Sequence, residues 1–434
     1  FQENNSFDVW SKEMQDYCER DVEVTYLLYE LIKKQNYSEK AIKLEHDFAH
    51  WIIKQSQGGV DFDETTAQSL FLSLTKQRLE IEQKLSAVFG SWRKSIGFKT
   101  YKRDNKKRGI KAGVPVEQFK TEIFNPNSRD HIADRLKTLG WIPKSFTATG
   151  KPEVNEKVLS SLPYEEAKLI NRHLLIQKRL GQLSDGEQAY LKLINKGKIH
   201  GKIITNGAVT GRCTHFNPNL AQVVSKGAEY GTEMRSLFIA PTNMVMCGID
   251  FSGLELRVLA SYLCNYDNGD FAKTLLEADI HSKNQQILGL ETRDKAKTFI
   301  YAYIYSAGNE RISEILKVSV AEAKRIREKF ERAIPALKNL KTAVALKYRN
   351  QKWIYGLDKR KLMCRAEYSS LNTLIQSAGA LLVKAGTVIV NEDLQQAGFV
   401  WGKDYRMVLH VHDEMQFVVH KDKIEEFKNI AKDL

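Results

Sequence analysis

Apolar residues in the first third of the chain recur at helical spacing. The positions that define this pattern between residues 38 and 90 are Ala41, Leu44, Phe48, Trp51 and Ile52. Positions three and four apart lie on one face of a helix, and a second helix is expected after Asp63, because aspartate is a favoured N-cap residue. Helical patterning returns over residues 127–195. The sequence therefore predicts a helical region interrupted by a different segment, residues 93–123.

From Lys198 onward, strand-like runs alternate with helical ones. The expected strands are 198–204, 245–249, 405–412 and 415–420, and the expected helices are 252–265 and 291–307. The last two strands meet at Asp413-Glu414, which indicates a hairpin with carboxylates at its turn. The mixture predicts an α+β fold with a largely antiparallel sheet, preceded by one helical domain and interrupted by another.

Residues 93–123 are crowded with cations and poor in apolar residues. The cations are Arg93, Lys94, Lys99, Lys102, Arg103, Lys106, Lys107, Arg108 and Lys111. This composition predicts a loop or a weakly ordered arm. A solvated charge run and an arm that follows nucleic-acid phosphates both account for it.

Composition narrows the class of protein. A chain of 434 residues, 42% of them hydrophobic, is long enough for two or three packed domains. The net charge of +13 favours a polyanionic partner, nucleic acid first and an acidic membrane second. The longest apolar run, residues 378–390, contains Lys384 and is expected to be a buried helix, so no membrane partner is predicted.

The cysteines and the first residue bear on the cellular context. The five cysteines, Cys18, Cys213, Cys247, Cys264 and Cys364, are scattered without a close pair. This spacing argues against a disulfide framework and against a zinc site, and it favours the reducing cytoplasm. The chain opens on Phe1 rather than methionine and is expected to be a fragment of a longer parent.

Two acidic motifs and one cationic helix carry candidate chemistry. Asp250 ends a predicted strand just before a helix, where it either faces an open edge or serves as the helix N-cap. Asp413 and Glu414 are adjacent acids at a turn, which a hard divalent cation would neutralise, although an ordinary polar turn is the simpler explanation.

The cationic helix has two positive charges followed by two aromatic rings. Arg293, Lys297, Tyr301 and Tyr305 are spaced four apart, so they share one helix face. Phosphates can bind the charges while a base stacks on a ring. Without the acidic motifs, an amphipathic helix with aromatics in the core would be preferred.

Taken together and in this order, these motifs resemble those of family A DNA polymerases, the relatives of bacterial polymerase I. Motif A corresponds to Asp250–Ala260, motif B to Arg293–Gly308, and motif C to His412-Asp413-Glu414. Within the family the chain looks most similar to the replicative polymerases of short-tailed T-odd bacteriophages. The segments that add to this resemblance are 210–212, 218–222, 267–269, 279–281 and 371–380.

The resemblance implies a right-hand polymerase fold, with an antiparallel palm sheet, helical fingers and a helical thumb. The implied domains are a 3′–5′ exonuclease remnant (1–37), the thumb (38–197, with the basic arm 93–123), the palm (198–265 and 357–434) and the fingers (266–356). Tyr17 and Asp21 match the last exonuclease motif, but the earlier acidic motifs would lie upstream of Phe1. Proofreading is therefore not expected of this chain.

The resemblance also implies roles for single residues in the transfer of nucleotides. Asp250 and Asp413 would bridge two Mg²⁺ ions, for which Mn²⁺ can substitute, with the Phe251 backbone carbonyl as a further ligand and Glu414 in support. The expected nucleotide-binding residues are Glu255, His281, Arg293, Lys297 and Tyr301. Among them, Glu255 would exclude a ribose, and a tyrosine at 301 implies ready use of dideoxynucleotides.

Primer and template contacts are implied for a second set of residues: Arg212, Gln222, Tyr305, Asn372, Gln376 and His412. Minor-groove contacts accept every sequence because the acceptors there are nearly alike for all base pairs. The expected partners are primer–template DNA and dNTPs, and the chain is expected to act as a monomer in the cytoplasm, that of the host if it is phage-encoded.

Two departures and two alternatives remain open. The phage enzymes that use a thioredoxin clamp have a long insertion where residues 93–123 stand, and this segment is short, so thioredoxin is not expected. Family members also continue beyond the final hairpin. The alternatives are a relative of the single-subunit RNA polymerases, against which Glu255 argues, and a non-catalytic DNA-binding fragment.

Overall fold

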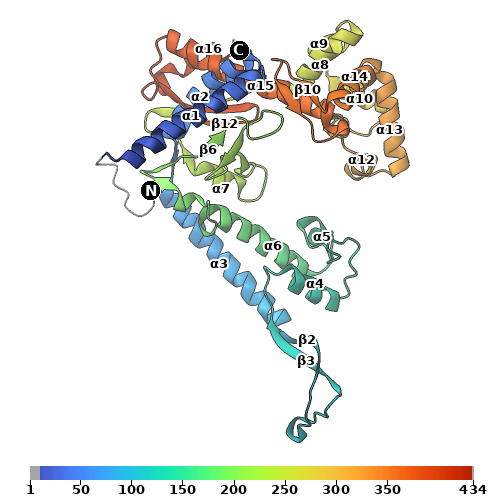
Figure 1. Ribbon diagram of the computed structural model, residues 1–434. Helices are drawn as coiled ribbons and strands as arrows, with labels where there is room; N and C mark the ends of the chain where they lie inside the picture. The colour runs from blue at the N-terminus through green and yellow to red at the C-terminus, as the bar shows by residue number, and fades with distance from the viewer. Residues whose placement is uncertain (1–9, 433–434) are drawn as a thin grey trace. The chain divides into compact units, whose positions relative to one another are not determined.

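A computed structural model describes residues 10–432 of the chain (Figure 1). The chain forms two compact units. The first contains the chain up to Val60, Gly201–Phe216 and everything from Ala240 onward, and the second contains Asp61–His200 and Asn217–Ile239. The expected thumb, residues 38–197, does not coincide with either unit, since residues 39–58 belong to the first. The domain boundaries therefore stay a prediction.

A three-stranded antiparallel sheet lies at the centre of the first unit, in the order β12-β13-β9. Its strands are β9 (Met244–Asp250), β12 (Tyr405–Val411) and β13 (Glu414–His420). Alternating buried residues such as Tyr405, Met407 and Phe417 face a core cluster that also contains Phe427. The hairpin and its antiparallel sheet are thus confirmed.

Three helices accompany this sheet: α2 (Glu39–Gly58), α15 (Ser370–Gln396) and α16 (Ile424–Lys432). Helix α2 packs against α15 and β12. By length and composition α15 could cross a membrane, but 72% of its most apolar window is buried inside the protein. It is longer than the apolar run seen in the sequence, and it is the core helix of this unit.

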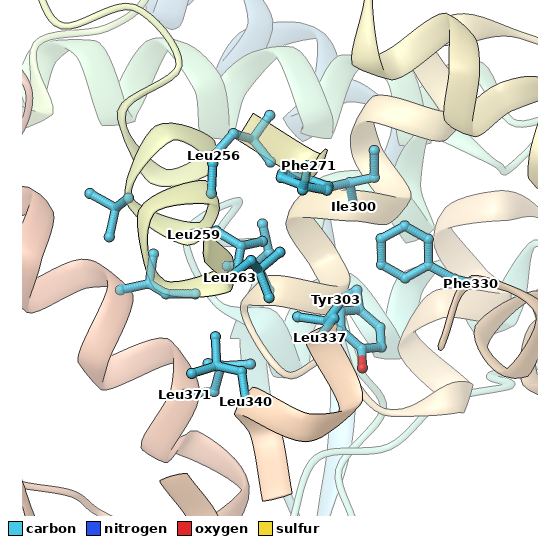
Figure 2. Close-up of a cluster of buried hydrophobic side chains, with 14 of the residues drawn as sticks. Leu256, Leu259, Leu263, Phe271, Ile300, Tyr303, Phe330, Leu337, Leu340 and Leu371 are labelled. Atoms are coloured by element: carbon cyan, nitrogen blue, oxygen red, sulfur yellow. The ribbon is translucent and has the colours of Figure 1, made fainter. Parts of the chain in front are cut away.

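A cluster of helices follows β9 in the chain and forms its own core. The helices are α8 (Leu254–Asp267), α9 (Asp270–Glu277), α10 (Ile280–Leu288), α11 (Arg293–Ile304), α12 (Asn309–Leu316), α13 (Val320–Ala333) and α14 (Pro335–Gln351). Figure 2 shows Leu259 and Leu263 of α8 facing Ile300 and Tyr303 of α11. Burying leucines of this size contributes about 1.5–3 kcal/mol each, which holds these helices around one core.

Smaller elements complete the first unit. They are α1 (Lys12–Lys34) and the antiparallel pairs β6 (Lys202–Ile204) with β7 (Thr214–Phe216) and β10 (Trp353–Tyr355) with β11 (Lys361–Met363). The single strand expected at 198–204 is wrong. It divides at Gly201 into β5 (Lys198–Ile199), which pairs in the second unit, and β6.

The second unit is mainly helical. Its helices are α3 (Glu64–Phe89), α4 (Arg129–Thr138), α5 (Glu156–Ser160), α6 (Glu165–Leu180) and α7 (Gly231–Ser236). Leu74 and Leu85 of α3 pack with Ile170 and Ile176 of α6 in one buried cluster. A sheet of short strands, in the order β4-β5-β1-β8, contains β4 (Ile194–Asn195), β5, β1 (Val60–Phe62) and β8 (Phe238–Ile239).

The expected loop at residues 93–123 is instead a long antiparallel hairpin, β2 (Ser91–Thr100) with β3 (Pro115–Ile123). It extends beyond the ends of α3 and α4 (Figure 1). Its register shifts between Ser95 and Phe98. Most side chains of both strands are exposed, so the ribbon lacks the polar–apolar alternation that identifies a half-buried strand.

Candidate active site

Asp250 and Asp413 meet where two turns of the first unit come together. Asp250 is the last residue of β9, and its Cα partner across the ladder is Glu414, the first residue of β13. The Phe251 backbone N–H donates to the Asp413 carbonyl over 3.0 Å. The N-cap of α8 is Gly253, so the interpretation of Asp250 as a helix cap is wrong.

The acids around Asp250 alter its proton affinity. Partial burial and then the negative charges of Asp413, Glu414 and Glu255 raise the pKa of the Asp250 carboxyl. Like charges held together in this way are stabilised by a divalent cation with oxygen ligands. Within residues 10–432, no group of three or more His, Cys, Asp or Glu side chains is placed to hold a metal, so a metal there would depend on the two aspartates and backbone oxygens.

Glu414 is held by a neighbour on its own strand. The Gln416 side-chain amide donates to the Glu414 carboxylate. A Cβ at Gly248, on the facing strand, would stand 2.7 Å from that amide nitrogen, so glycine is needed there to leave room for Gln416. Glu414 is therefore oriented by the sheet rather than left as an ordinary turn residue.

His412 and Asp413 form the two-residue turn between β12 and β13. His412 has a φ of +52°, in the left-handed region that costs a non-glycine residue on the order of 1 kcal/mol. Burial first and Arg212 second lower the pKa of the His412 imidazole. The turn thus contains a histidine in a backbone conformation that glycine would adopt at lower cost.

Glu255, a buried residue of α8, is the centre of a hydrogen-bonded group. Its Oε1 accepts from Arg212 Nη2 over 3.0 Å and from the Tyr305 hydroxyl over 3.0 Å. Burial and then Glu255 raise the pKa of Tyr305 to about 12, so the phenol stays a donor. A residue predicted to bind nucleotide and two predicted to bind primer or template are therefore in direct contact.

The cationic helix α11 presents its predicted residues on one face. Phe299 and Tyr303 are its buried aromatics, whereas Tyr305 is 41% exposed. The interpretation of Tyr301 and Tyr305 as core residues is therefore wrong for Tyr305, and Tyr301 is only half-buried. The Tyr301 ring lies 6.4 Å from that of Tyr305 and 6.3 Å from that of His281 between centroids.

Arg293 is bound by an acid that sequence reasoning left out of the site. Its Nε and Nη2 donate to the two carboxylate oxygens of Asp279 over 2.6 and 3.1 Å, and the His281 backbone N–H also reaches Asp279 over 3.1 Å. Arg293 holds the pKa of the Asp279 carboxyl well below its usual range. Lys297 is exposed on the same helix, and the position of Asp279 two residues before His281 was the available signal.

The remaining predicted residues are more dispersed. Asn372 and Gln376 lie one turn apart on α15, and the Asn372 side-chain oxygen is buried without a hydrogen-bond donor among the described atoms. Gln222 ends a short 3-10 helix in the second unit and is exposed there. Tyr17 and Asp21 are exposed one turn apart on α1, which has no buried residues.

Comparisons with known proteins agree with this arrangement of motifs. The model of DNA polymerase family A matches residues 99–434. The DNA-directed DNA polymerases of Enterobacteria phage T3 and Escherichia phage T7 are each 34% identical to the chain, over 96% of it and 71% of the relative. The DNA polymerase I of Helicobacter pylori is 26% identical over 74% of the chain and 39% of the relative.

A solved structure supports the fold. The polymerase domain of Pol1 from M. smegmatis, in complex with DNA primer–template and dNTP, matches with a TM-score of 0.71 at 17% identity. The match covers 90% of this chain and 66% of that one. The chain therefore belongs to DNA polymerase family A and is a DNA-directed DNA polymerase related to the phage T3 and T7 enzymes.

Proposed function

We propose that this chain extends the 3′-hydroxyl of a DNA primer with dNTPs by metal-assisted nucleotidyl transfer, in the replication of phage DNA. The observation that carries this proposal is the placement of Asp250 beside Asp413, at the end of β9 and in the β12–β13 turn. Two carboxylates on adjacent rigid turns can hold reacting oxygens in line.

Family A polymerases generally use divalent metal ions, and the oxygen donors here suit them. Burial first, and then Asp413, Glu414 and Glu255, raise the pKa of Asp250, and a bound divalent cation would favour its ionised form. Asp250, Asp413 and the Phe251 carbonyl would hold two Mg²⁺ ions, which supply activation of the primer hydroxyl and neutralisation of the triphosphate.

Residues on and beside α11 would bind the triphosphate. Arg293 and Lys297 offer their charges one turn apart on an exposed face. Burial first and Arg293 second lower the pKa of His281, so the imidazole is neutral and can donate a hydrogen bond to phosphate without adding charge. These side chains orient the nucleotide with respect to Asp250 and Asp413.

Glu255 and Tyr301 would select the sugar. Glu255 is held by Arg212 and Tyr305, so it cannot easily move aside for a 2′-hydroxyl. Burial and then Glu255 and Asp413 raise the pKa of Tyr301, which keeps its hydroxyl protonated as a donor. Glu255 and Tyr301 would thus favour deoxyribose over ribose, because a fixed Glu255 side chain leaves no room for the 2′-hydroxyl.

In the first unit, DNA would bind through Arg212, Asn372, Gln376 and His412. In the second unit, Gln222 is a predicted DNA contact. The tip of the β2–β3 hairpin offers a further contact. Its backbone is folded, since Asp104 Oδ1 accepts from Ala112 N–H over 2.7 Å and Gly109 ends a short helical turn. The exposed cations on this tip are Lys102, Arg103, Lys106, Lys107, Arg108 and Lys111.

These tip cations lack internal counter-charges. Among residues 10–432, the side chain of none of these six residues forms an ion pair, a cation–π contact or a hydrogen bond. Unpaired cations at the end of an ordered ribbon favour an arm that binds DNA phosphates over a solvated loop. Such an arm would contact DNA without a thioredoxin clamp.

Primer extension with Mg²⁺ tests the proposed function. Asp250→Asn and Asp413→Asn keep side-chain size and remove charge, and each should lower extension by about a thousandfold or more. Asp422→Asn, at a side chain that is 88% exposed, is the matched control and should extend normally. Extension that survives both site substitutions would contradict the proposal.

Two further outcomes separate the alternatives. Incorporation of NTPs in preference to dNTPs would indicate a relative of the RNA polymerases. Binding of primer–template without extension at any divalent metal would indicate a non-catalytic DNA-binding fragment.

A further inference from the structure

Buried charges of the first unit gather beneath the turn that carries Arg212. Lys384 Nζ of α15 donates to both carboxylate oxygens of Glu45 on α2 over 2.8 Å each, and to Asn206 Oδ1 over 3.1 Å. Arg360, before β11, donates from Nη1 to Glu45 over 2.7 Å and to Asn206 over 3.5 Å. Asn206 therefore receives hydrogen bonds from two cations that share one acid.

This charged group is unusual because it is buried. The Lys384 side chain is 2% exposed, those of Glu45 and Arg360 15% and 16%. Arg360 also binds a second acid, Asp358, at 2.8 Å from Nε. The two cations of the group therefore face two carboxylates. Buried ion pairs contribute little net stability compared with apolar residues of similar size, so stability alone does not account for this group.

The turn above the group is closed on itself. The Ala208 N–H donates to the Arg212 carbonyl over 3.1 Å, and the Gly211 N–H donates to the Ala208 carbonyl over 2.9 Å. Gly211 has a φ of +78°, and a Cβ there would stand 3.2 Å from Arg360 Nη1. One end of the turn, at Gly211, thus lies against Arg360. The other end is held by the hydrogen bonds that Asn206 accepts from Lys384 and Arg360.

Arg212 is the last residue of this turn, and its side chain reaches Glu255. We propose that Lys384, Glu45 and Arg360 act through Asn206 as positioning residues, which hold the 206–212 turn so that the Arg212 guanidinium is ready at Glu255. The proposal deepens the proposed function, on which it rests for the contact of Arg212 with the primer. A turn held in advance loses less conformational entropy when DNA binds.

Asn206→Ala is the most selective test, because it removes the anchor of the turn and leaves Lys384 bonded to both oxygens of Glu45. Lys384→Met is less suitable, because Glu45 would lose its hydrogen bonds from Lys384 and the unit could unfold. In Asn206→Ala we expect affinity for primer–template, measured by fluorescence anisotropy without dNTP, to fall about tenfold, within the range of couplings between residues in one network.

A double-mutant cycle with Arg212→Ala separates positioning from scaffolding. If Asn206 acts through Arg212, adding Asn206→Ala to Arg212→Ala should weaken DNA binding no further. An equal tenfold loss in both backgrounds would overturn the proposal. Since binding is measured without catalysis, a chain that binds DNA but does not extend it would contradict the proposed function and leave this test intact.

Asn391→Ala provides a control for general loss of stability. Asn391 is an asparagine of the same unit that is buried, whereas Asn206 is exposed, and its amide donates to the Thr387 carbonyl on α15 over 2.7 Å, away from the 206–212 turn. Hydrogen exchange at the Ala208 and Gly211 amides should accelerate in Asn206→Ala and not in Asn391→Ala. Equal acceleration in both variants would mean general loosening and would also overturn the proposal.

Discussion

The Tyr305 hydroxyl donates to the Glu255 carboxylate over 3.0 Å, and this bond joins the cationic helix α11 to the helix that follows Asp250. Arg212 binds the same carboxylate oxygen. The acid expected to exclude ribose is thus held by one residue from the segment predicted to form the fingers and by one from the segment predicted to form the palm.

Glu255→Ala should relax the selection against ribonucleotides. Without the carboxylate, the 2′-hydroxyl has room, and we expect discrimination to fall by about tenfold to a hundredfold. The measurement is the ratio of kcat/KM for dATP and ATP in single-nucleotide extension.

Tyr305→Phe keeps the ring and removes only the hydrogen bond to Glu255. In this variant Arg212 still binds the Glu255 carboxylate, so the loss of discrimination between dATP and ATP should be smaller than in Glu255→Ala. A larger effect would mean that Tyr305 acts on the sugar itself.

Tyr301→Phe should impair the use of dideoxynucleotides. The protonated Tyr301 hydroxyl can replace a contact that the missing 3′-hydroxyl would make, and phenylalanine cannot. We expect termination in a ddNTP titration to require at least about tenfold more ddNTP. Equal titration curves for the two enzymes would reject this role.

Neutralising the hairpin tip should weaken DNA binding in a salt-dependent way. For Lys106, Lys107, Arg108 and Lys111 changed to Gln, the slope of log K against log salt should become less negative by up to about 0.9 for each DNA phosphate that the variant no longer neutralises. The control changes four exposed cations elsewhere, Lys33, Lys34, Lys40 and Lys43, to Gln. If the two variants behave alike, the tip is a solvated loop.

Acid should destabilise the first unit through a buried histidine. His410 is fully buried, and its two ring nitrogens have no hydrogen-bond partner among the described atoms. Burial first, and then His215, Lys384 and His412, lower its pKa to about 3. The unfolded chain binds a proton near the ordinary value of 6.5, so between pH 6.5 and pH 3 it holds more protons than the folded one.

The stability contributed by neutral His410 is therefore present at neutral pH and is lost as the pH falls from 6.5 toward 3, by at most about 1.4 kcal/mol per pH unit. Urea unfolding at pH 7 and pH 5 measures this loss. The glutamine in His410→Gln cannot titrate, so the free energy of unfolding of this variant should differ less between pH 7 and pH 5. If the difference is unchanged, other groups such as His215 cause it.

Local patterns predicted the hairpin of residues 405–420 and the helix that begins at Arg293. Strands β12 and β13 are buried over most of their length, and α11 has one buried side, so apolar residues marked these elements in the sequence. Phe98 and Phe119 of the β2–β3 ribbon are exposed, and no such pattern marked those strands.

Pairings between distant residues could not be predicted in this way. Lys384 in an apolar run indicated only a buried helix. No pattern in the sequence around it predicted that its partner is Glu45, 339 positions away. The contact of Arg212 with Glu255 likewise depends on how a turn and a helix pack. The order of motifs led to the predicted site residues, but the partners of these residues could be found only from the fold.

The bidentate pair of Arg293 with Asp279 implies competition at the proposed triphosphate site. Any phosphate that takes over the Nε and Nη2 donors of Arg293 has to displace a carboxylate already bound to them, at 2.6 Å from Nε. The cost of breaking this pair lowers the affinity of Arg293 for every anion by the same factor. Weakly binding anions such as chloride should therefore leave the pair intact at concentrations that would occupy a free arginine.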